Sequence, residues 1–346
     1  MADSTKDKHT FAIRGVVEGF FGPPWSHAAR MKMIDFMGAA GYNCYIYAPK
    51  DDPFHRDRWR EDYPKADAKK IACLAAECAM RGVDFCWALS PGLSIRYSSA
   101  KQFQELCAKF LALSHLGVKT FALFLDDIPE EIQHTSDKKH FPSLAAAHAD
   151  LANRLLAHLE KKVPGARLWF CPTAYFGDGS SPYIATLGAQ LDRKIDVFWT
   201  GPQVVSPSIS AAQARAFAKA LGRKPLLWDN YPVNDYNRST LNIGPLRGRD
   251  PKLGSLLAGY FTNPMNEPFA SKLPLLTIAD YLKAPEKYDP EKSFRAAVRK
   301  LCGPDAAAPL ELLSQYSGAD VLSGAPRPVP AAALDAARGL WNQAEH

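Results

Sequence analysis

The sequence predicts an α/β fold, a (β/α)8 TIM barrel with a short C-terminal helical appendage. Short apolar segments alternate with amphipathic helical segments, an order typical of parallel βαβ units. Polar residues follow almost every apolar segment, and in a barrel these strand ends meet at one face, where active sites form. No Gly-x-Gly-x-x-Gly motif follows the first apolar segment, which argues against a doubly wound dinucleotide-binding sheet.

Eight segments are expected to be strands, because each is short, rich in β-branched or aromatic residues and ends in Gly, Pro, Asn, Asp or Thr. They are Phe11–Gly19, Asn43–Pro49, Asp84–Pro91, Thr120–Asp126, Arg167–Thr173, Asp196–Gly201, Pro225–Asn230 and Gly259–Thr262. Their nearly continuous apolar character is typical of parallel strands that are covered on both faces.

Five intervening segments have the clearest helical periodicity, with apolar residues recurring at i, i+3 and i+4. They are Ala28–Ala40, Asp67–Arg81, Ala100–Leu116, Ser143–Lys162 and Ala211–Leu221. The alternation of these helices with the strands implies parallel βαβ units, an order that a (β/α)8 barrel and a doubly wound sheet share.

Three regions are expected along the 346 residues: a disordered N-terminal tail (1–10), a barrel domain (11–284) and a small, partly loose helical appendage (285–346). The appendage is predicted to contain two helices, Glu291–Leu301 and Ala331–Trp341, which flank a stretch rich in Ala, Pro and Gly. Barrels typically need about 250 residues, so the central region is long enough.

Composition excludes several classes of function. No apolar run approaches the roughly 18 residues of a membrane-spanning helix. The net charge is +6, but Lys and Arg are scattered instead of forming a basic stripe, so nucleic acid is not an expected partner. The polar opening segment lacks an apolar signal core, and the seven cysteines contain no Cys-x-x-Cys pair, which together predict a reduced, cytoplasmic protein. Cys44, Cys86 and Cys171 are expected to be core thiols outside the chemistry.

The strongest local feature is FALFLDDI, in which Asp126 and Asp127 follow an apolar strand. Adjacent carboxylates there repel each other and lose hydration, so folding alone gives little reason for them. Three interpretations stay open: a helix cap beside a solvated neighbour, a hard-cation site, or an acid/base pair. Since neighbouring side chains on a strand point to opposite faces, both reach one pocket only where the strand unravels.

Other residues after the strands could bind a ligand or could simply form turns or surface charges. An Asn/Asp-rich segment with aromatic neighbours suits sugar hydroxyls and a sugar ring, but it also suits a turn. A glycine lets the backbone approach a ligand closely. The candidates are Gly19, Lys50, Trp228, Asn230, Asp235 and Asn263. Each is weak alone, and their expected convergence on one rim is what supports a site.

Eight motifs in order carry a resemblance to a known family. They are GVVEGFFGPPW, YAPKDDPFHRDRWRE, SPGL, FALFLDDI, CPTAYFG, WTGPQVVS, WDNYPVNDY and TNPMNE. Together they resemble the catalytic domain of glycoside hydrolase family 84, the O-GlcNAcase family, over roughly residues 11–284. The resemblance is closer to protein O-GlcNAcases than to generic secreted hexosaminidases.

The resemblance implies a cofactor-free barrel enzyme that removes β-linked N-acetylglucosamine (GlcNAc) from Ser or Thr of proteins, with retention and without a metal. The substrate's own 2-acetamido oxygen would attack C1 and form an oxazoline, a substrate-assisted exception to the two-carboxylate scheme. Asp126 would orient and polarise the acetamido N–H, and Asp127 would act as general acid and then as general base.

The resemblance also implies a substrate-binding set. Its hydroxyl- and acetamide-binding members would be Gly19, Lys50, Asn230, Asp235 and Asn263. Tyr175 and Trp228 would form walls of the acetamide pocket, with Tyr175 also bonding the oxazoline oxygen. The expected partner is a GlcNAc-bearing glycoprotein, glycopeptide or glycoside, with no nucleic acid and no membrane, and a homodimer is left open.

A few positions depart from the family pattern. Phe21 stands where the motif usually has Tyr, Ala174 where Glu is frequent, and Pro129 follows Asp-Asp-Ile. These departures concern rim contacts and therefore aglycone preference. Three rival functions stay open: hydrolysis of small GlcNAc glycosides or cell-wall fragments, an inactive sugar-binding barrel, and a chitinase-like enzyme, whose Asp-x-x-Asp-x-Asp-x-Glu motif is missing.

Overall fold

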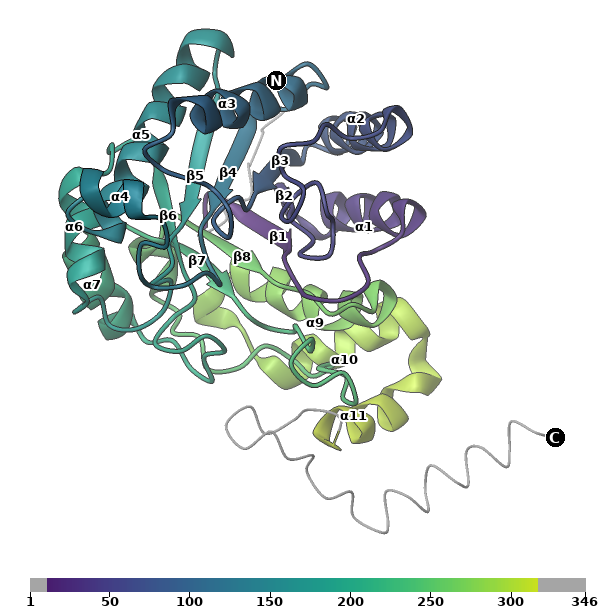
Figure 1. Cartoon of the computed structure of the whole chain (residues 1–346). Coiled ribbons are helices and arrows are strands. Elements are labelled where there is room, and N and C mark those ends of the chain that lie inside the picture. Colours follow the sequence, from purple (N-terminus) through teal and green to yellow (C-terminus); the bar gives the residue numbers. More distant parts are fainter. Residues whose placement is uncertain (1–10, 317–346) are drawn as a thin grey trace, which may run out of the picture.

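Eight parallel strands close into a barrel in the computed structural model of the chain, which describes residues 11–316 (Figure 1). Each strand pairs with the next along the chain, and β1 pairs with β8 to close the ring. The strands are β1 (Arg14–Glu18), β2 (Cys44–Tyr47), β3 (Asp84–Leu89), β4 (Thr120–Phe124), β5 (Arg167–Cys171), β6 (Asp196–Trp199), β7 (Leu226–Asp229) and β8 (Gly259–Thr262). The predicted fold class is confirmed.

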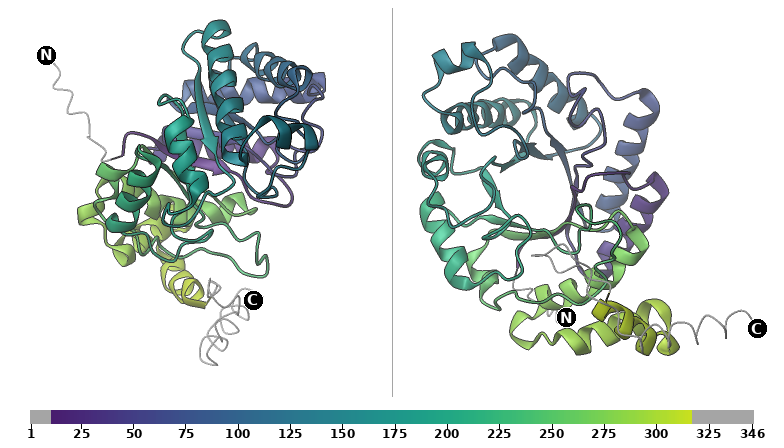
Figure 2. Two further views of the ribbon diagram at one scale, coloured as in Figure 1. Left: turned by 60° about the vertical axis from the view of Figure 1, so that its left-hand side comes forward. Right: turned by 60° about the horizontal axis from the view of Figure 1, so that its bottom comes forward.

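Helices surround the strands as an outer ring, which the right-hand view of Figure 2 shows most clearly. They are α1 (His27–Ala40), α2 (Lys65–Met80), α3 (Ala100–Ser114), α4 (Thr135–His140), α5 (Leu144–Lys162), α6 (Pro182–Gln190), α7 (Ala211–Leu221), α8 (Leu253–Leu256), α9 (Pro268–Lys283), α10 (Pro290–Cys302) and α11 (Ala307–Tyr316), with short 3-10 turns at Pro285–Lys287 and Pro304–Ala306. The five predicted helices correspond to α1, α2, α3, α5 and α7, and Glu291–Leu301 corresponds to α10.

Serine residues define where many of these helices begin. The side chains of Ser26, Ser99, Ser143, Ser181 and Ser210 each accept a backbone N–H of the first turn. Such caps satisfy donors that have no partner within the helix. At α7 the cap is reciprocal, because the Gln213 side chain also accepts from the Ser210 backbone N–H.

The longest unpredicted helix is α9, and its burial explains why the pattern did not reveal it. It is buried on most sides, from Ser271 through Ile278, and it contains Pro274. A helix that is covered all round lacks the apolar stripe on which periodicity depends. The other unpredicted helices, α4, α6, α8 and α11, have ten residues or fewer.

Alternate residues of the strands form two separate cores. One set fills the barrel interior and includes Val17, Ile46, Phe124 and Phe261. The neighbouring residues face the helices and belong to a larger cluster outside the barrel. Register agrees with this division, because Val17 pairs with Ile46 across β1 and β2. The odd or even position of a residue along its strand, here called strand parity, therefore decides the direction of its side chain. Just beyond a strand, one parity points over the barrel and the other points toward the helices.

After the barrel, α10 packs against α9 through a third apolar cluster. Phe294 and Val298 of α10 are buried with Leu273 and Leu276 of α9. The division at residue 284 stays a prediction. The tail (1–10) and the second expected appendage helix, Ala331–Trp341, lie outside the described residues.

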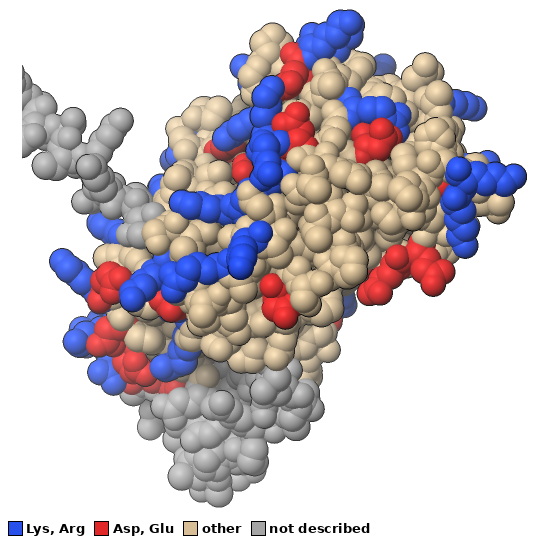
Figure 3. Space-filling view, turned by 90° about the vertical axis from the view of Figure 1, so that its left-hand side faces the viewer, with Lys and Arg blue, Asp and Glu red and all other residues tan. Residues whose placement is uncertain are grey.

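Charges of both signs are mixed on the face of the molecule in Figure 3. Several Lys and Arg side chains of the described residues pair with carboxylates, as Lys194 does with Glu160 at 2.7 Å. Among the helices of residues 11–316, none combines the length and apolar character that a membrane span needs.

Candidate active site

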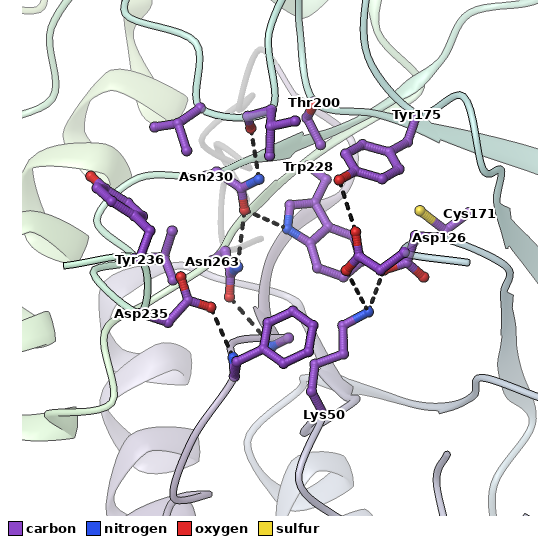
Figure 4. Close-up of a pocket in the computed structure, with 16 residues that line it drawn as sticks. Lys50, Asp126, Cys171, Tyr175, Thr200, Trp228, Asn230, Asp235, Tyr236 and Asn263 are labelled. Atoms are coloured by element: carbon purple, nitrogen blue, oxygen red, sulfur yellow. Dashed lines mark hydrogen bonds and ion pairs between the residues drawn. The ribbon is translucent and has the colours of Figure 1, made fainter. Parts of the chain in front are cut away.

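A cavity of about 370 Å³ lies at the carboxyl ends of the strands (Figure 4). Its volume falls within the range typical of small-molecule sites. All nine residues predicted for the site line it: Gly19, Lys50, Asp126, Asp127, Tyr175, Trp228, Asn230, Asp235 and Asn263. Loops after six of the eight strands therefore converge on one space.

Strand parity explains how so many of these side chains reach the same cavity. Interior residues Val17, Phe124, Trp228 and Phe261 are each followed two positions later by a cavity residue. The cavity residues reached in this way are Gly19, Asp126, Asn230 and Asn263. Because side chains alternate along a strand, the cavity continues the inward-facing rows of the barrel.

Asp127 breaks this parity, and its backbone conformation shows how. Within residues 11–316 it is the one non-glycine residue with a positive φ, at 50°. On an extended strand its side chain would face away from that of Asp126. The left-handed turn lets both carboxylates line the same cavity. Such backbone costs about 1–3 kcal/mol and persists where surrounding structure enforces it, commonly at functional sites.

The two carboxylates have different surroundings. The Asp126 side chain is nearly buried and pairs with the Lys50 ammonium. The Asp127 side chain is 32% exposed; one oxygen accepts from Tyr175 Oη at 2.9 Å, and the other lies 3.5 Å from Lys50 Nζ. Desolvation lowers the pKa of Lys50, but the two carboxylates more than offset it, so its pKa is raised. Burial and the Asp127 charge raise the pKa of Tyr175, which keeps its hydroxyl as a donor.

One oxygen of Asp126 has unused bonding capacity. Its Oδ1 is buried and meets no hydrogen-bond partner in the described part of the chain. Leaving a buried acceptor unsatisfied costs roughly 1–3 kcal/mol. An N–H donor from a ligand would satisfy this oxygen. A carboxylate or an apolar group would not, because neither has a hydrogen to donate.

Asn230 and Asn263 form a fixed amide network at the other side of the cavity. Asn230 Oδ1 accepts from Trp228 Nε1 and from Asn263 Nδ2, both at 2.9 Å. Asn230 Nδ2 donates to the Val204 carbonyl at 2.7 Å, and Asn263 Oδ1 accepts from the Gly19 N–H at 3.3 Å. These bonds hold the Trp228 ring and both amides in place before a ligand arrives, a form of preorganisation.

Gly19 is required for this packing, which differs from the reason expected from the sequence. A Cβ at this position would lie 2.4 Å from Cζ2 and 2.8 Å from Cη2 of Trp228. The glycine therefore admits the Trp228 ring, and close approach of its backbone to a ligand stays a prediction.

The mouth of the cavity carries Asp235 and several exposed apolar side chains. Asp235 Oδ2 accepts from the Phe21 N–H at 2.8 Å, and burial raises the pKa of this carboxyl. Phe21, Val204 and Tyr236 are each about two-fifths exposed while also lining the cavity. The rim is thus apolar around a polar interior.

Some polar residues at strand ends do not reach the cavity. Glu18 faces the helices, where it pairs with Arg30 and accepts from Tyr45. Asp229 likewise pairs with Arg249 and accepts from Tyr260. Both residues occupy strand positions whose side chains face the helices. The expectation that polar residues at strand ends meet at one face therefore holds only for those that point inward.

Sequence reasoning missed several cavity residues. Those that it did not commit to are Phe21, Cys171, Thr200, Val204, Val205, Val233 and Tyr236. Cys171 is a buried strand residue as expected, yet it also borders the cavity, and burial raises the pKa of its thiol. Thr200 and Cys171 could have been predicted, because both occupy inward-facing positions along their strands. The valines could not, because no feature of the sequence distinguishes them from other apolar residues. Cys44 and Cys86 are buried as expected, whereas Cys73 and Cys302 are exposed.

A cation between the two aspartates was one open interpretation of the sequence. The Lys50 ammonium already lies between them. In residues 11–316, no group of three or more His, Cys, Asp or Glu side chains is arranged to hold a metal ion. The geometry therefore favours acid/base chemistry at this pair.

A family model described as beta-N-acetylglucosaminidase matches residues 14–315. Over 276 residues the chain is 37% identical to the protein O-GlcNAcases of Rattus norvegicus and Mus musculus, which covers 78% of this chain and 30% of each relative. The chain spans less than a third of the length of these curated relatives.

Solved structures give the same picture at the level of the fold. A mutant of the Thermobaculum terrenum O-GlcNAc hydrolase superposes with a TM-score of 0.89 and 39% identity, covering 93% of this chain and 70% of that one. The structure of CpGH84B superposes with a TM-score of 0.83 and 32% identity, covering 97% and 59%.

Proposed function

The chain belongs to the beta-N-acetylglucosaminidase family, and on that premise we propose that it is a retaining exo-β-N-acetylglucosaminidase that removes O-linked GlcNAc from Ser or Thr of proteins or glycopeptides. Its substrates would be GlcNAc-bearing proteins, peptides or glycosides. The reaction would need neither a cofactor nor a metal.

One observation carries the proposal: two carboxylates in different environments share a cavity, and the buried one has an unused acceptor. Asp126 Oδ1 has no protein partner within the described residues, and the substrate's 2-acetamido N–H is a donor of the required kind. Asp127 is partly exposed at the cavity mouth, where a leaving oxygen and then a water molecule have access. The division suits substrate-assisted cleavage.

In the first step, the acetamido carbonyl oxygen bonds to C1 as the bond from C1 to the aglycone oxygen breaks. Asp127 gives its proton to the leaving oxygen, and Asp126 accepts the acetamido N–H as the oxazoline forms. In the second step, water bonds to C1 and passes a proton to Asp127, while the oxazoline C1–O bond breaks and restores the amide. Two inversions at C1 give net retention.

The remaining cavity residues would bind the sugar. Asn230, Asn263 and Asp235 offer amide and carboxylate groups for the hydroxyls, and Trp228 and Tyr175 offer apolar walls for the acetamide methyl group. Tyr175 Oη donates its single O–H to Asp127 in the free protein and would turn that O–H to the oxazoline oxygen when substrate is bound. Burial lowers and the two aspartates raise the pKa of Lys50, with a net rise, so Lys50 keeps its charge and would hold the Asp126 carboxylate in place through their ion pair.

We further propose that residues 11–284 form the catalytic domain, with 285–346 as a helical appendage, and that the protein works in the cytoplasm. The seven cysteines are free, as is usual in reducing compartments.

Hydrolysis of an O-GlcNAc serine glycopeptide beside an aryl N-acetyl-β-glucosaminide tests the proposal. Turnover of both supports it, with the β-anomer as the first product. Turnover of the aryl glycoside alone would instead indicate small GlcNAc glycosides as substrates. Sugar binding without turnover of either would indicate an inactive, sugar-binding barrel.

A further inference from the structure

The left-handed backbone at Asp127 needs a partner that holds it, and Arg56 supplies one. Arg56 lies in the loop between β2 and α2, and its Nη2 donates to the Asp127 carbonyl at 3.1 Å. This is a charge-assisted bond to the residue whose φ is 50°. The contact joins the loop after β2 to the loop after β4.

The Arg56 guanidinium is itself held by an aromatic ring of a third loop. Its Cζ lies 5.4 Å from the centroid of the Phe21 ring, and Lys50 Nζ lies 5.6 Å from the same centroid. The Phe21 backbone is fixed in turn, since its N–H donates to Asp235 and its carbonyl accepts from Arg238. The loop after β1 therefore orients the Arg56 guanidinium, and the guanidinium in turn contacts the backbone of the loop after β4.

We propose that Arg56 is a positioning residue for Asp127: through the Asp127 carbonyl it holds the left-handed backbone that aims this carboxyl at the leaving oxygen. Phe21, which stands where the family pattern usually has Tyr, provides the ring on which Arg56 rests. The inference rests on the proposed function, because it assigns Arg56 to the proton-transfer step alone.

Two features indicate a functional role more than a stabilising one. Arg56 Nη1 is buried, yet the described residues offer it no hydrogen-bond partner. A buried unpaired donor beside a residue with strained backbone is unfavourable for folding, and such costs are typical of functional sites. A salt bridge would be the usual way to stabilise an arginine, as Arg58 does two residues later with Glu61.

The test compares wild type with Arg56→Met, which keeps the aliphatic stem but removes the charge and the donors. Substrates are aryl N-acetyl-β-glucosaminides whose leaving phenols range from unsubstituted phenol to dinitrophenol. A misdirected general acid matters most where the leaving group needs a proton. We expect kcat/KM to fall by roughly 10- to 100-fold on the phenyl glycoside and by less than about threefold on the dinitrophenyl glycoside.

Three further measurements decide between positioning and mere stability. Arg56→Lys should restore part of the phenyl activity, because an ammonium can still donate to the carbonyl. Binding of an oxazoline-like thiazoline should change little, because Arg56 does not line the sugar cavity. Arg58→Met, on the same loop but directed at Glu61 and Phe54, is the matched control and should behave as wild type.

A loss that is equal for all leaving groups, or no loss at all, would overturn the proposal for Arg56. Should Arg56→Met fail to fold, Arg56→Gln, which is too short to span the same distance, provides the same comparison. If wild type itself cleaves none of these glycosides, the proposed function fails instead, so the two failures are distinguishable.

Discussion

At the scale of single residues, Asp126 and Asp127 are adjacent in sequence but differ in burial and in hydrogen-bond partners. Asp126 is nearly buried and ion-paired with Lys50, whereas Asp127 is partly exposed and accepts from Tyr175. Different surroundings let two identical side chains take different roles in acid/base chemistry. The substitution of each should therefore leave a different kinetic signature.

We expect Asp126→Ala and Asp127→Ala both to lower kcat/KM on glycosides of poor leaving groups by roughly 100-fold or more. On the dinitrophenyl glycoside, whose phenol departs without a proton, Asp127→Ala should approach wild type while Asp126→Ala stays impaired. The measurement is kcat/KM across graded leaving groups. Asp51→Ala, an exposed carboxylate beside Lys50, is the control, and near-normal rates for either catalytic variant would refute the assignment.

Gly19→Ala tests how tightly the Trp228 wall is packed. The new Cβ would lie 2.4 Å from the ring, so Trp228 must move and strain its bond to Asn230. Overpacking of this kind costs about 1–3 kcal/mol of unfolding free energy, measurable in urea, and should also weaken sugar binding. Gly244→Ala, whose Cβ meets nothing closer than 3.6 Å, is the matched control. Equal stability of both variants would contradict the packing argument.

At the scale of elements, a buried histidine ties two helices to the loop that carries Tyr175. His148 of α5 bonds Tyr183 of α6 at 2.7 Å and Tyr97 at 2.8 Å. Tyr183 Oη also accepts from the Thr173 N–H at 3.2 Å, and Thr173 Oγ1 donates to the Leu125 carbonyl. Burial lowers the pKa of His148 to about 3, so the folded protein holds it neutral.

This lowered pKa predicts a stability that falls with acid. Below pH 6.5 the unfolded chain binds a proton at His148 that the folded chain rejects until about pH 3. The free energy of unfolding should therefore drop by about 2 kcal/mol between pH 7 and pH 5 from this residue. Urea unfolding of His148→Gln should show a pH dependence weaker by that amount. Exposed His115→Gln is the control, and an unchanged dependence for His148→Gln would contradict the prediction.

Sequence patterns predicted the elements better than their ends. All eight strands were expected, yet β1 begins at Arg14 and not at Phe11, since the predicted ranges included turn residues. The helix α9 was missed because all-round burial removes amphipathic periodicity. Parity along the strands separated inward Asn230 from outward Asp229, a distinction that a list of strand-end polar residues does not make.

At the scale of the whole molecule, the cavity exists only when the barrel is closed. Its lining comes from loops that lie more than 240 residues apart in sequence, as the bond between Gly19 and Asn263 shows. A ligand of this cavity therefore binds the folded chain alone and must stabilise it.

A thiazoline analogue of the oxazoline should stabilise the whole protein against unfolding. At 100 times its Kd the expected gain is about 2.7 kcal/mol, seen as a rise in Tm. Binding should be much tighter than that of a simple glycoside, because intermediates and transition-state analogues exploit the same contacts more fully. Glucose, which lacks the acetamido group, is the control. Millimolar binding of the thiazoline would favour a sugar-binding role without catalysis.

The sequence by itself determined the order of strands and helices and the fold class, because periodicity is a local property. Its resemblance to a known family also indicated nine residues that line one cavity. Only the tertiary structure decided how they act together. It showed the left-handed turn that brings Asp127 to the side of Asp126, the unpartnered Asp126 oxygen, and the Arg56 contact across three loops. These depend on atoms brought together by barrel closure, and no local pattern along the chain encodes such distances.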